Sequence, residues 1–310
     1  MCSCKFKNIV EAVIAESPFQ KKKLERYLAG MDDLYFVRAE EFANKYLGYL
    51  DSQCVPLDFA VTAYLDMCKS MMKCQIEFMK TGTYSIANQG QAFEEIYSSS
   101  ERMKPYMIAL ALSQFLWPTH YRIYEAFEAT VRKNAPNIGS YLEVGPGHGL
   151  YLSKAIEYLK PETVIQAVDI SPISIEISES IIKHIHPNIS NINFWTGDFL
   201  NFSPTALYDF IAIGEVLEHV NEPYKMLCKM RSLLSDSGTA FVTTSINSPA
   251  VDHVYHFKSV DDVRKMLYAS RLSIVNEQIL PVEELPMEEI VARKITINYS
   301  AAVERDNGHG

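Results

Sequence analysis

The chain has 310 residues, of which 48% are hydrophobic and 22% charged, a composition typical of a folded globular protein rather than a disordered or fibrous one. Its formal net charge of −9 argues against tight nucleic-acid binding, because that affinity comes largely from Lys and Arg side chains that neutralise phosphates. No apolar run approaches the roughly 20 residues that span a bilayer, and the N-terminus lacks the apolar stretch of a secretion signal, so we expect a cytoplasmic protein with neither nucleic-acid nor membrane partners.

The first part of the chain carries a helical pattern. Apolar side chains recur there at four-residue steps, for example at Phe59, Ala63, Met67 and Met71. Helix breaks are expected at Pro18, near Gly82, at Pro105 and at Pro118. We therefore predict about five to seven helices, the last over about residues 119–133, in an all-α domain that covers residues 1–136.

The second part changes to short β-rich runs that alternate with helix-length segments. Expected strands cover 141–144, 164–168, 192–195, 210–213 and 239–244, with helices near 149–159, 173–185, 222–234 and 259–268. This alternation implies parallel βαβ units in a doubly wound sheet. Two further runs, about 272–280 and 294–303, have no obvious full helix between them and predict an antiparallel pair. The α/β domain is expected over residues 137–305.

A glycine-rich turn follows the first expected strand, in the string Tyr141-Leu-Glu-Val-Gly-Pro-Gly-His-Gly149. Glycines at such a turn let the backbone approach a ligand closely, and dinucleotide sites use them as well. Glu143 stands two residues before the first glycine, where its carboxylate would repel a pyrophosphate but suit an ammonium group. The turn therefore favours a cationic amino-acid ligand, while His148 is either a cofactor contact or an exposed loop residue.

Acids also follow the second and third expected strands. Asp169 ends an apolar strand, where a carboxylate accepts hydrogen bonds from both ribose hydroxyls. The alternative is that Asp169 caps the helix that begins near Ser171 and Pro172. After the third strand, Asp198 is placed to accept from an adenine amino group and Phe199 to stack on the base.

The fourth strand ends in Gly214-Glu215-Val-Leu-Glu218-His219-Val, in which Glu218 is expected to be a solvated or capping acid. Taken in order, these strings resemble the class I S-adenosylmethionine-dependent methyltransferases, in particular small-molecule members, over about residues 138–280. The resemblance implies a Rossmann-like seven-stranded sheet, here with an all-α N-terminal cap. It assigns Glu143, Gly145 and Gly147 to the methionine end of the cofactor, Asp169 with Ile170 to the ribose, Asp198 and Phe199 to adenine, and Glu215 to the transferable methyl.

Methyl transfer needs a base only when the acceptor holds its proton tightly. His253, in the loop after the fifth strand, is the first candidate, because family members often carry a His there and imidazole suits proton transfer near neutral pH. His219 and His256 are weaker candidates. Tyr121 lies just before the first strand and is expected either to contact the cofactor or to pack in the core. The six cysteines form no cluster at structural-zinc spacing, so we expect reduced thiols and no metal.

The resemblance implies methyl transfer from S-adenosyl-L-methionine, with S-adenosyl-L-homocysteine as the product, to the oxygen or nitrogen of a small molecule, in secondary metabolism for example. The short linker before the first strand predicts that the helical domain acts as an active-site cap. A homodimer is a further expectation. Two alternatives stay open: methylation of a peptide or protein side chain, and a noncatalytic scaffold that binds S-adenosylmethionine.

Overall fold

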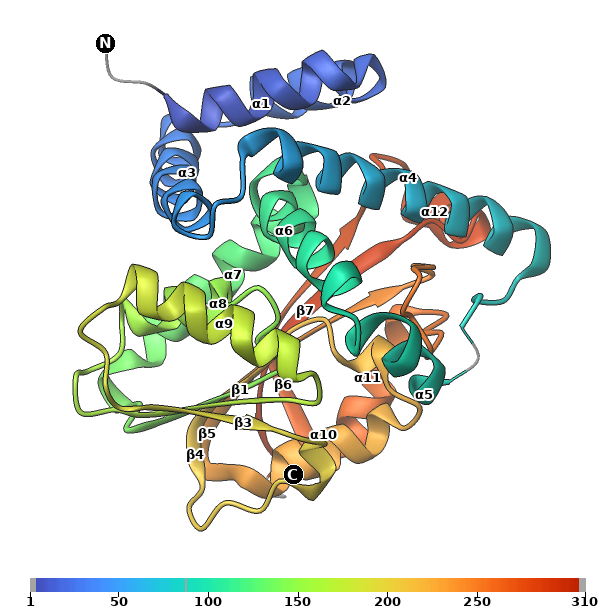
Figure 1. The fold of residues 1–310 in the computed structure, drawn as a ribbon. Coiled ribbons are helices and arrows are strands. Elements are labelled where there is room, and N and C mark those ends of the chain that lie inside the picture. Colours follow the sequence, from blue (N-terminus) through green and yellow to red (C-terminus); the bar gives the residue numbers. More distant parts are fainter. Residues whose placement is uncertain (1–3, 87, 307–310) are drawn as a thin grey trace.

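A computed structural model describes residues 4–86 and 88–306 (Figure 1). Within these residues, the N-terminal half is helical as predicted. Its α-helices are α1 (Lys5–Glu16), α2 (Pro18–Ala29), α3 (Asp33–Ser52), α4 (Leu57–Thr81), α5 (Gln89–Ala92), α6 (Ser100–Leu116) and α7 (Pro118–Asn134), with a π-helical turn η1 (Phe93–Tyr97) between α5 and α6. The expected break at Pro105 is wrong, because Pro105 lies within α6 near its start. Proline removes one N–H donor there, and the buried residues that follow, from Met107 to Leu116, hold the helix in place.

The second half forms a seven-stranded sheet in the order β3-β2-β1-β4-β5-β7-β6. The strands are β1 (Ser140–Val144), β2 (Val164–Asp169), β3 (Ile192–Thr196), β4 (Tyr208–Ile213), β5 (Leu234–Ile246), β6 (Leu272–Pro281) and β7 (Ile297–Arg305). β7 is antiparallel to both of its neighbours. The predicted Rossmann-like sheet, with its antiparallel final strand, is confirmed.

Helices cover both faces of this sheet. They are α8 (Leu150–Ile156), α9 (Pro172–Ile185), α10 (Pro223–Leu233), α11 (Val260–Ala269) and the short α12 (Met287–Ala292). The helix α12 lies between β6 and β7, where no full helix is expected from the sequence. β5 also begins at Leu234, earlier than expected, because Leu234 pairs with Tyr208 before the register shifts to Phe210 and Thr239.

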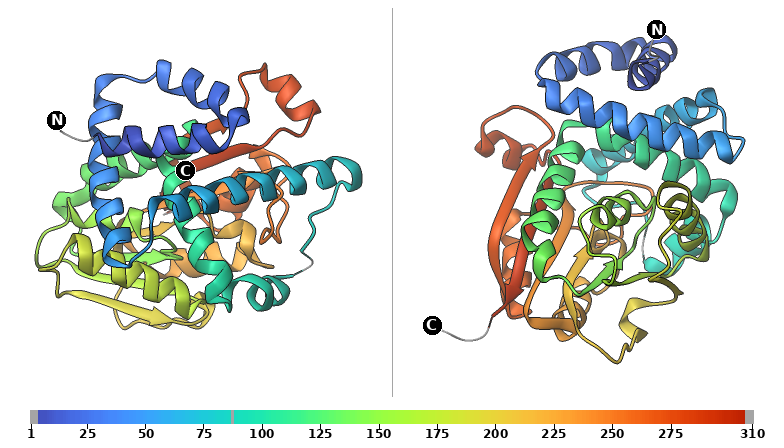
Figure 2. Two further views of the ribbon diagram at one scale, coloured as in Figure 1. Left: turned by 45° about the horizontal axis from the view of Figure 1, so that its top comes forward. Right: turned by 90° about the vertical axis from the view of Figure 1, so that its left-hand side faces the viewer.

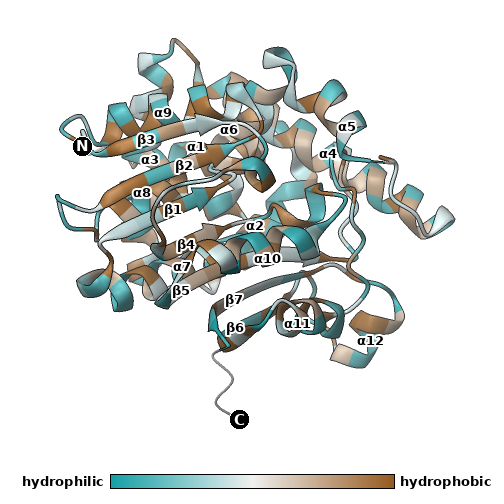
Figure 3. Ribbon diagram, turned by 90° about the horizontal axis from the view of Figure 1, so that it is seen from below, coloured by the Kyte–Doolittle hydropathy of each residue, from teal (hydrophilic) through white to brown (hydrophobic). Residues whose placement is uncertain are grey.

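The strands alternate their side chains between two hydrophobic cores, as the two-residue period of a strand requires. Tyr141 and Phe210 face the core formed with α1–α4 and α6–α9, whereas Leu142 and Ile211 face the core formed with α10 and α11. Figure 3 shows the apolar character of the parallel strands between their two helical layers. The inner strands are therefore buried on both faces.

The helical half shares the first of these cores rather than forming a separate one. Buried residues from Phe6 in α1 to Phe241 in β5 belong to one cluster. Lys45 of α3 also pairs with Glu157, just after α8, at 2.6 Å. The two views in Figure 2 show α6 and α7 against the sheet, with α1 and α2 outermost. No described helix is long and apolar enough to cross a membrane. The division at residues 136 and 137 stays a prediction.

Candidate active site

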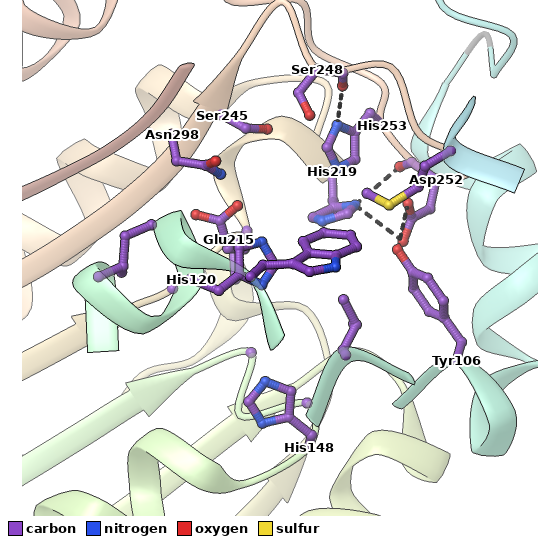
Figure 4. Close-up of a pocket in the computed structure, with 18 of the residues that line it drawn as sticks. Tyr106, His120, His148, Glu215, His219, Ser245, Ser248, Asp252, His253 and Asn298 are labelled. Atoms are coloured by element: carbon purple, nitrogen blue, oxygen red, sulfur yellow. Dashed lines mark hydrogen bonds and ion pairs between the residues drawn. The ribbon is translucent and has the colours of Figure 1, made fainter. Parts of the chain in front are cut away.

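The candidate site lies at the carboxyl edge of the parallel strands, where the chain leaves β1 toward β2 on one side and leaves β4 toward β5 on the other. Ligands bind at such a switch point in open α/β sheets. A cavity of about 1250 Å³ opens here between the sheet edge and the helical half (Figure 4). Among the residues predicted to form the site, those that line the cavity are Glu143, Gly145, Gly147, Asp169, Ile170, Asp198, Phe199, Glu215, His219 and His253.

Tyr121 lies outside this cavity, unlike the neighbouring His120 and Arg122, which line it. Its ring packs edge-on against Tyr35 at 4.8 Å between centroids, and its hydroxyl lies 3.4 Å from an Arg38 nitrogen. Tyr121 therefore packs in the core, which was the alternative, and does not line the site proposed for the cofactor. A helical turn of about 100° per residue carries Tyr121 to the far side of α7 from the cavity.

The glycine turn has the backbone geometry that only glycine adopts easily. Gly145 has a φ of 71° and Gly149 a φ of 69°, in the left-handed region. A Cβ atom at Gly145 would lie 2.5 Å from Cγ2 of Val216, and one at Gly149 would lie 2.6 Å from Cγ2 of Ile181. The turn therefore depends on glycine both for its conformation and for its close packing.

Glu143 is a buried acid at the floor of the glycine turn. Tyr141 donates a hydrogen bond of 2.5 Å to its Oε2 atom. Burial raises the pKa of Glu143 to about 8, against the opposing effect of the Tyr141 hydroxyl. A positively charged ligand beside Glu143 would stabilise the ionised form of this buried carboxyl group.

Asp169 is held by backbone groups of the turn that follows β2. Its Oδ1 accepts from the Ser171 amide at 2.8 Å, while the Ser171 side chain itself caps α9. Asp169 is therefore not the cap of that helix, which removes the alternative reading of this residue. Burial raises the pKa of Asp169 to about 6. Asp198 caps the short turn after β3 through Leu200, and Phe199 is buried beside it.

Two acids follow β4. Glu215 has a left-handed φ of 51°, and Thr243 Oγ1 donates to its carboxylate at 2.6 Å. Glu218, expected to be solvated or capping, is instead fully buried, with Thr244 Oγ1 donating to its Oε2 at 2.8 Å. The short 3₁₀ turn after β4 points Glu218 inward under β5. The sequence pattern does not predict this orientation.

The two histidines predicted as bases face each other, with ring centroids 4.7 Å apart. His253 Nδ1 lies 2.5 Å from the Ser248 carbonyl, so this nitrogen carries the proton and donates it, and Nε2 keeps its lone pair. Burial lowers the pKa of His253 to about 4. His256 is held outside the cavity lining by Asn247 at 2.8 Å.

One group of described residues has the spacing of a metal site. Glu218, His219 and His253 each bring one ligand atom within 4.8 Å of the others. Nitrogen and oxygen ligands of this kind suit a divalent transition metal. Both oxygens of Glu218, however, already accept from hydroxyls, Thr244 at 2.8 Å and Ser245 at 3.4 Å. The expectation of no metal stays a prediction.

Asp252, Tyr97 and Tyr106 were not singled out from the sequence, although they line the cavity and are joined by hydrogen bonds. Asp252 is fully buried and accepts hydrogen bonds from both tyrosines. Its position directly before His253, in the loop after β5, is the sequence signal for it. The tyrosines lie on helical segments, where a functional tyrosine and a core tyrosine look alike.

A family model described as a methyltransferase domain matches residues 119–276, which is half of the chain. The chain belongs to this methyltransferase family. The match confirms the resemblance to class I S-adenosylmethionine-dependent methyltransferases. A curated relative of this methyltransferase is the ubiquinone biosynthesis O-methyltransferase of Glaesserella parasuis serovar 5 (strain SH0165), 28% identical over 129 residues that cover 41% of the chain and 53% of the relative. The methyltransferase thus spans about half the length of the curated relatives it matches.

Two solved structures share the fold of this methyltransferase. An O-methyltransferase family protein from Burkholderia thailandensis has a TM-score of 0.56 at 14% identity, covering 81% of this chain and 73% of its own. The mitomycin 7-O-methyltransferase has a TM-score of 0.54 at 12% identity, covering 80% of this chain and 70% of its own. Both alignments cover more of the chain than the sheet half contains, so the likeness extends into the helical half.

Proposed function

We propose that this methyltransferase transfers the methyl group of S-adenosyl-L-methionine to an oxygen or nitrogen of a small molecule and releases S-adenosyl-L-homocysteine. The observation that carries the proposal is one continuous cavity, which runs from the glycine turn to the histidine pair under the helical half. Its volume of about 1250 Å³ exceeds the usual range of about 300–1,000 Å³ for a single ligand site. The cavity has room for a cofactor and an acceptor together.

The cofactor is proposed to lie along the carboxyl ends of β1 to β4. The ammonium group of its methionine end pairs with Glu143, beside Gly145 and Gly147. Asp169, with Ile170, holds the ribose, and Asp198 and Phe199 hold adenine. The order of the strands supports this arrangement, because β3, β2, β1 and β4 are adjacent and present these groups in sequence along one edge.

The methyl group would then lie near Glu215, facing the two histidines. Methyl transfer is an in-line displacement, so positioning the acceptor atom at about 3–3.5 Å from the methyl in a dry site supplies much of the rate. His219 and His253 lie on the acceptor side of this point, and one of them takes the acceptor proton. Glu215 orients the sulfonium through its negative charge.

The acceptor side of the cavity is lined by both apolar and polar side chains. Leu65, Met71 and Met72 of α4 and Trp117 before α7 line it together with Gln75, Gln114 and Arg122, and Ser245 and Asn298 add polar groups from the sheet half. The C-terminal part of α4 reaches the loop after β5, where Phe78 packs on His256 at 5.1 Å. The helical half therefore roofs the acceptor space, which favours a small molecule over a peptide laid in an open groove.

Calorimetry with S-adenosylmethionine and S-adenosylhomocysteine tests the cofactor, and stoichiometric binding is expected. A panel of phenols, amines and short peptides, assayed for S-adenosylhomocysteine release, then tests the acceptor class. Turnover of a phenol or amine supports the proposal. Turnover of peptides alone favours a peptide methyltransferase, and cofactor binding without turnover of any acceptor favours a scaffold. The cytoplasmic location and the homodimer remain expectations alongside this proposal.

A further inference from the structure

A network of buried polar groups joins the helical half to His219. The Tyr97 hydroxyl, at the end of η1, lies 2.8 Å from His219 Nδ1 and donates to Oδ2 of Asp252 at 3.0 Å. Tyr106, on α6, donates to the other Asp252 oxygen, Oδ1, at 3.2 Å. Asp252 Oδ2 itself lies 3.5 Å from His219 Nδ1. Figure 4 shows His219, Asp252 and Tyr106 converging on one side of the cavity.

The hydrogen-bond partners fix the position of the imidazole proton. His219 Nδ1 lies 3.1 Å from the backbone carbonyl of Asp252, and a carbonyl only accepts. The single hydroxyl proton of Tyr97 is already donated to the Asp252 carboxylate. Both contacts therefore require that Nδ1 of His219 carries the proton, which leaves the lone pair on Nε2.

We propose that Tyr97 and Asp252 are positioning residues that make His219, rather than His253, the general base of this methyltransferase. This inference rests on the proposed methyl transfer to an acceptor that carries a proton. Nδ1–H of His219 donates to the Tyr97 oxygen and the Asp252 carbonyl, and Nε2 accepts the proton of the acceptor. The charged imidazolium is then stabilised by the Asp252 carboxylate, both directly and through the Tyr97 hydroxyl.

The surroundings of the two histidines differ in charge. The titratable and charged groups that face His219 from the neighbouring elements are Tyr97 and Tyr106 from the helical half, Asp169 after β2, Glu215 and Glu218 after β4, and Asp252 and His253 after β5. Among these acids, Asp252 places its Oδ2 atom 3.5 Å from His219 Nδ1. Nδ1 of His253 instead donates to the neutral Ser248 carbonyl, and burial and the charge of His219 lower the pKa of His253 against the opposing effect of Asp252. His253 Nε2 therefore remains a neutral hydrogen-bond acceptor.

In the reaction, the acceptor oxygen or nitrogen forms a bond to the methyl carbon as the carbon–sulfur bond breaks. The electron pair of that bond goes to sulfur, which becomes the thioether of S-adenosylhomocysteine. The acceptor proton moves to Nε2 of His219, which loses it to water after the product leaves. Tyr97 and Asp252 keep their protonation states throughout.

The arrangement also gives the helical half a role beyond covering the site. Both tyrosines come from η1 and α6, whereas His219 and Asp252 come from loops of the sheet half. The backbone carbonyl of Tyr97 accepts from Ser171 Oγ at 2.8 Å, which ties η1 to the start of α9. The base is therefore fully oriented only when this part of the helical half lies against the sheet edge.

The test is nitrogen NMR of the full chain, labelled with ¹⁵N-histidine and saturated with S-adenosylhomocysteine. The chain has eight histidines, and His219→Gln assigns the signal of interest by its loss. In the wild-type protein we expect neutral His219 to carry its proton on Nδ1. We expect Asp252→Asn to admit the other tautomer, because Tyr97 no longer donates its proton to a carboxylate and can donate it to His219 Nδ1.

Tyr35→Phe is the matched control. It removes the hydroxyl of another buried tyrosine of the helical half, which donates to the Phe115 carbonyl away from the cavity, and it should leave the His219 signal unchanged. A proton on Nε2 of wild-type His219, or an unchanged tautomer in Asp252→Asn, would overturn the inference. The tautomer measurement on the wild-type protein decides the matter even if a variant does not fold. Calorimetry of the same samples separates this outcome from failure of the proposed function, which would appear as no binding of S-adenosylhomocysteine.

Discussion

Glu215 and Thr243 are joined by two hydrogen bonds across the edge of β4 and β5. Thr243 Oγ1 donates to the Glu215 carboxylate at 2.6 Å and accepts from the Glu215 amide at 2.8 Å. Glu215 holds a φ of 51° there, a conformation that costs a non-glycine residue of order 1–3 kcal/mol. The threonine hydroxyl thus fixes both the backbone and the carboxylate of the residue proposed to face the methyl group.

Replacing this hydroxyl should loosen the β4 turn. Thr243→Val keeps the shape of the side chain but removes both hydrogen bonds, so we expect the free energy of unfolding to fall by about 1–3 kcal/mol. Chemical denaturation measures this change. Thr243→Ser retains the hydroxyl and should lose much less. Equal losses in the two variants would show that packing of the Thr243 methyl, and not the hydroxyl, holds Glu215.

Cofactor affinity should depend on pH through Glu143. The pKa of Glu143 is raised to about 8 in the free protein, and an ammonium group binds the ionised carboxylate, so affinity should rise with pH up to about 8 and fall below it. Well below pH 8, the affinity should fall by at most about tenfold for each pH unit. Calorimetry with S-adenosylhomocysteine between pH 6 and 8.5, in buffers of different ionisation enthalpy, measures both the affinity and the proton released.

Glu143→Gln supplies the comparison for this pH dependence. The variant should bind more weakly and show a flatter profile over the same pH interval. A wild-type affinity that does not change with pH would mean that the ligand ammonium is held by other groups.

Asp169 should contribute to cofactor affinity through the ribose. Asp169→Ala removes an acceptor for both ribose hydroxyls, so we expect binding of S-adenosylhomocysteine to weaken by about 1–3 kcal/mol. Asp236→Ala removes an exposed acid that pairs with Arg305, away from the cavity, and should leave the affinity unchanged. If Asp169→Ala instead lowered only the thermal stability, the role of Asp169 would be confined to the turn after β2.

Removal of metal ions should leave the protein unaffected. The hydroxyls of Thr244 and Ser245 donate to the two oxygens of Glu218, so this buried carboxyl group has hydrogen-bond partners from the protein itself. After dialysis against EDTA, we expect unchanged binding of S-adenosylhomocysteine and no visible absorption bands on titration with Co²⁺. Bands that appear at one equivalent of Co²⁺ and vanish in His253→Ala would show that Glu218, His219 and His253 form a metal site.

Some of this protein is determined by local sequence. The β-rich runs that alternate with helix-length segments, the glycine-rich turn and the acids at strand ends predict the sheet, its antiparallel last strand and the line of groups from Glu143 to Asp198. Each of these features depends on residues close together in the chain, since a strand end and the turn after it are consecutive. The order of parallel strands then brings their carboxyl ends to one edge.

The tertiary structure decides the rest, because it depends on which segments meet. Glu218 is buried because β5 passes over it, and Tyr121 belongs to the core because α3 packs against α7 with Tyr35 and Arg38. The partners of His219 come from Tyr97, more than a hundred residues earlier in the chain, and from Asp252, which follows the next strand. The periodicity of the sequence does not predict such contacts. They arise when the helical half and the sheet bury a common apolar core, which places tyrosines of one half against histidines of the other.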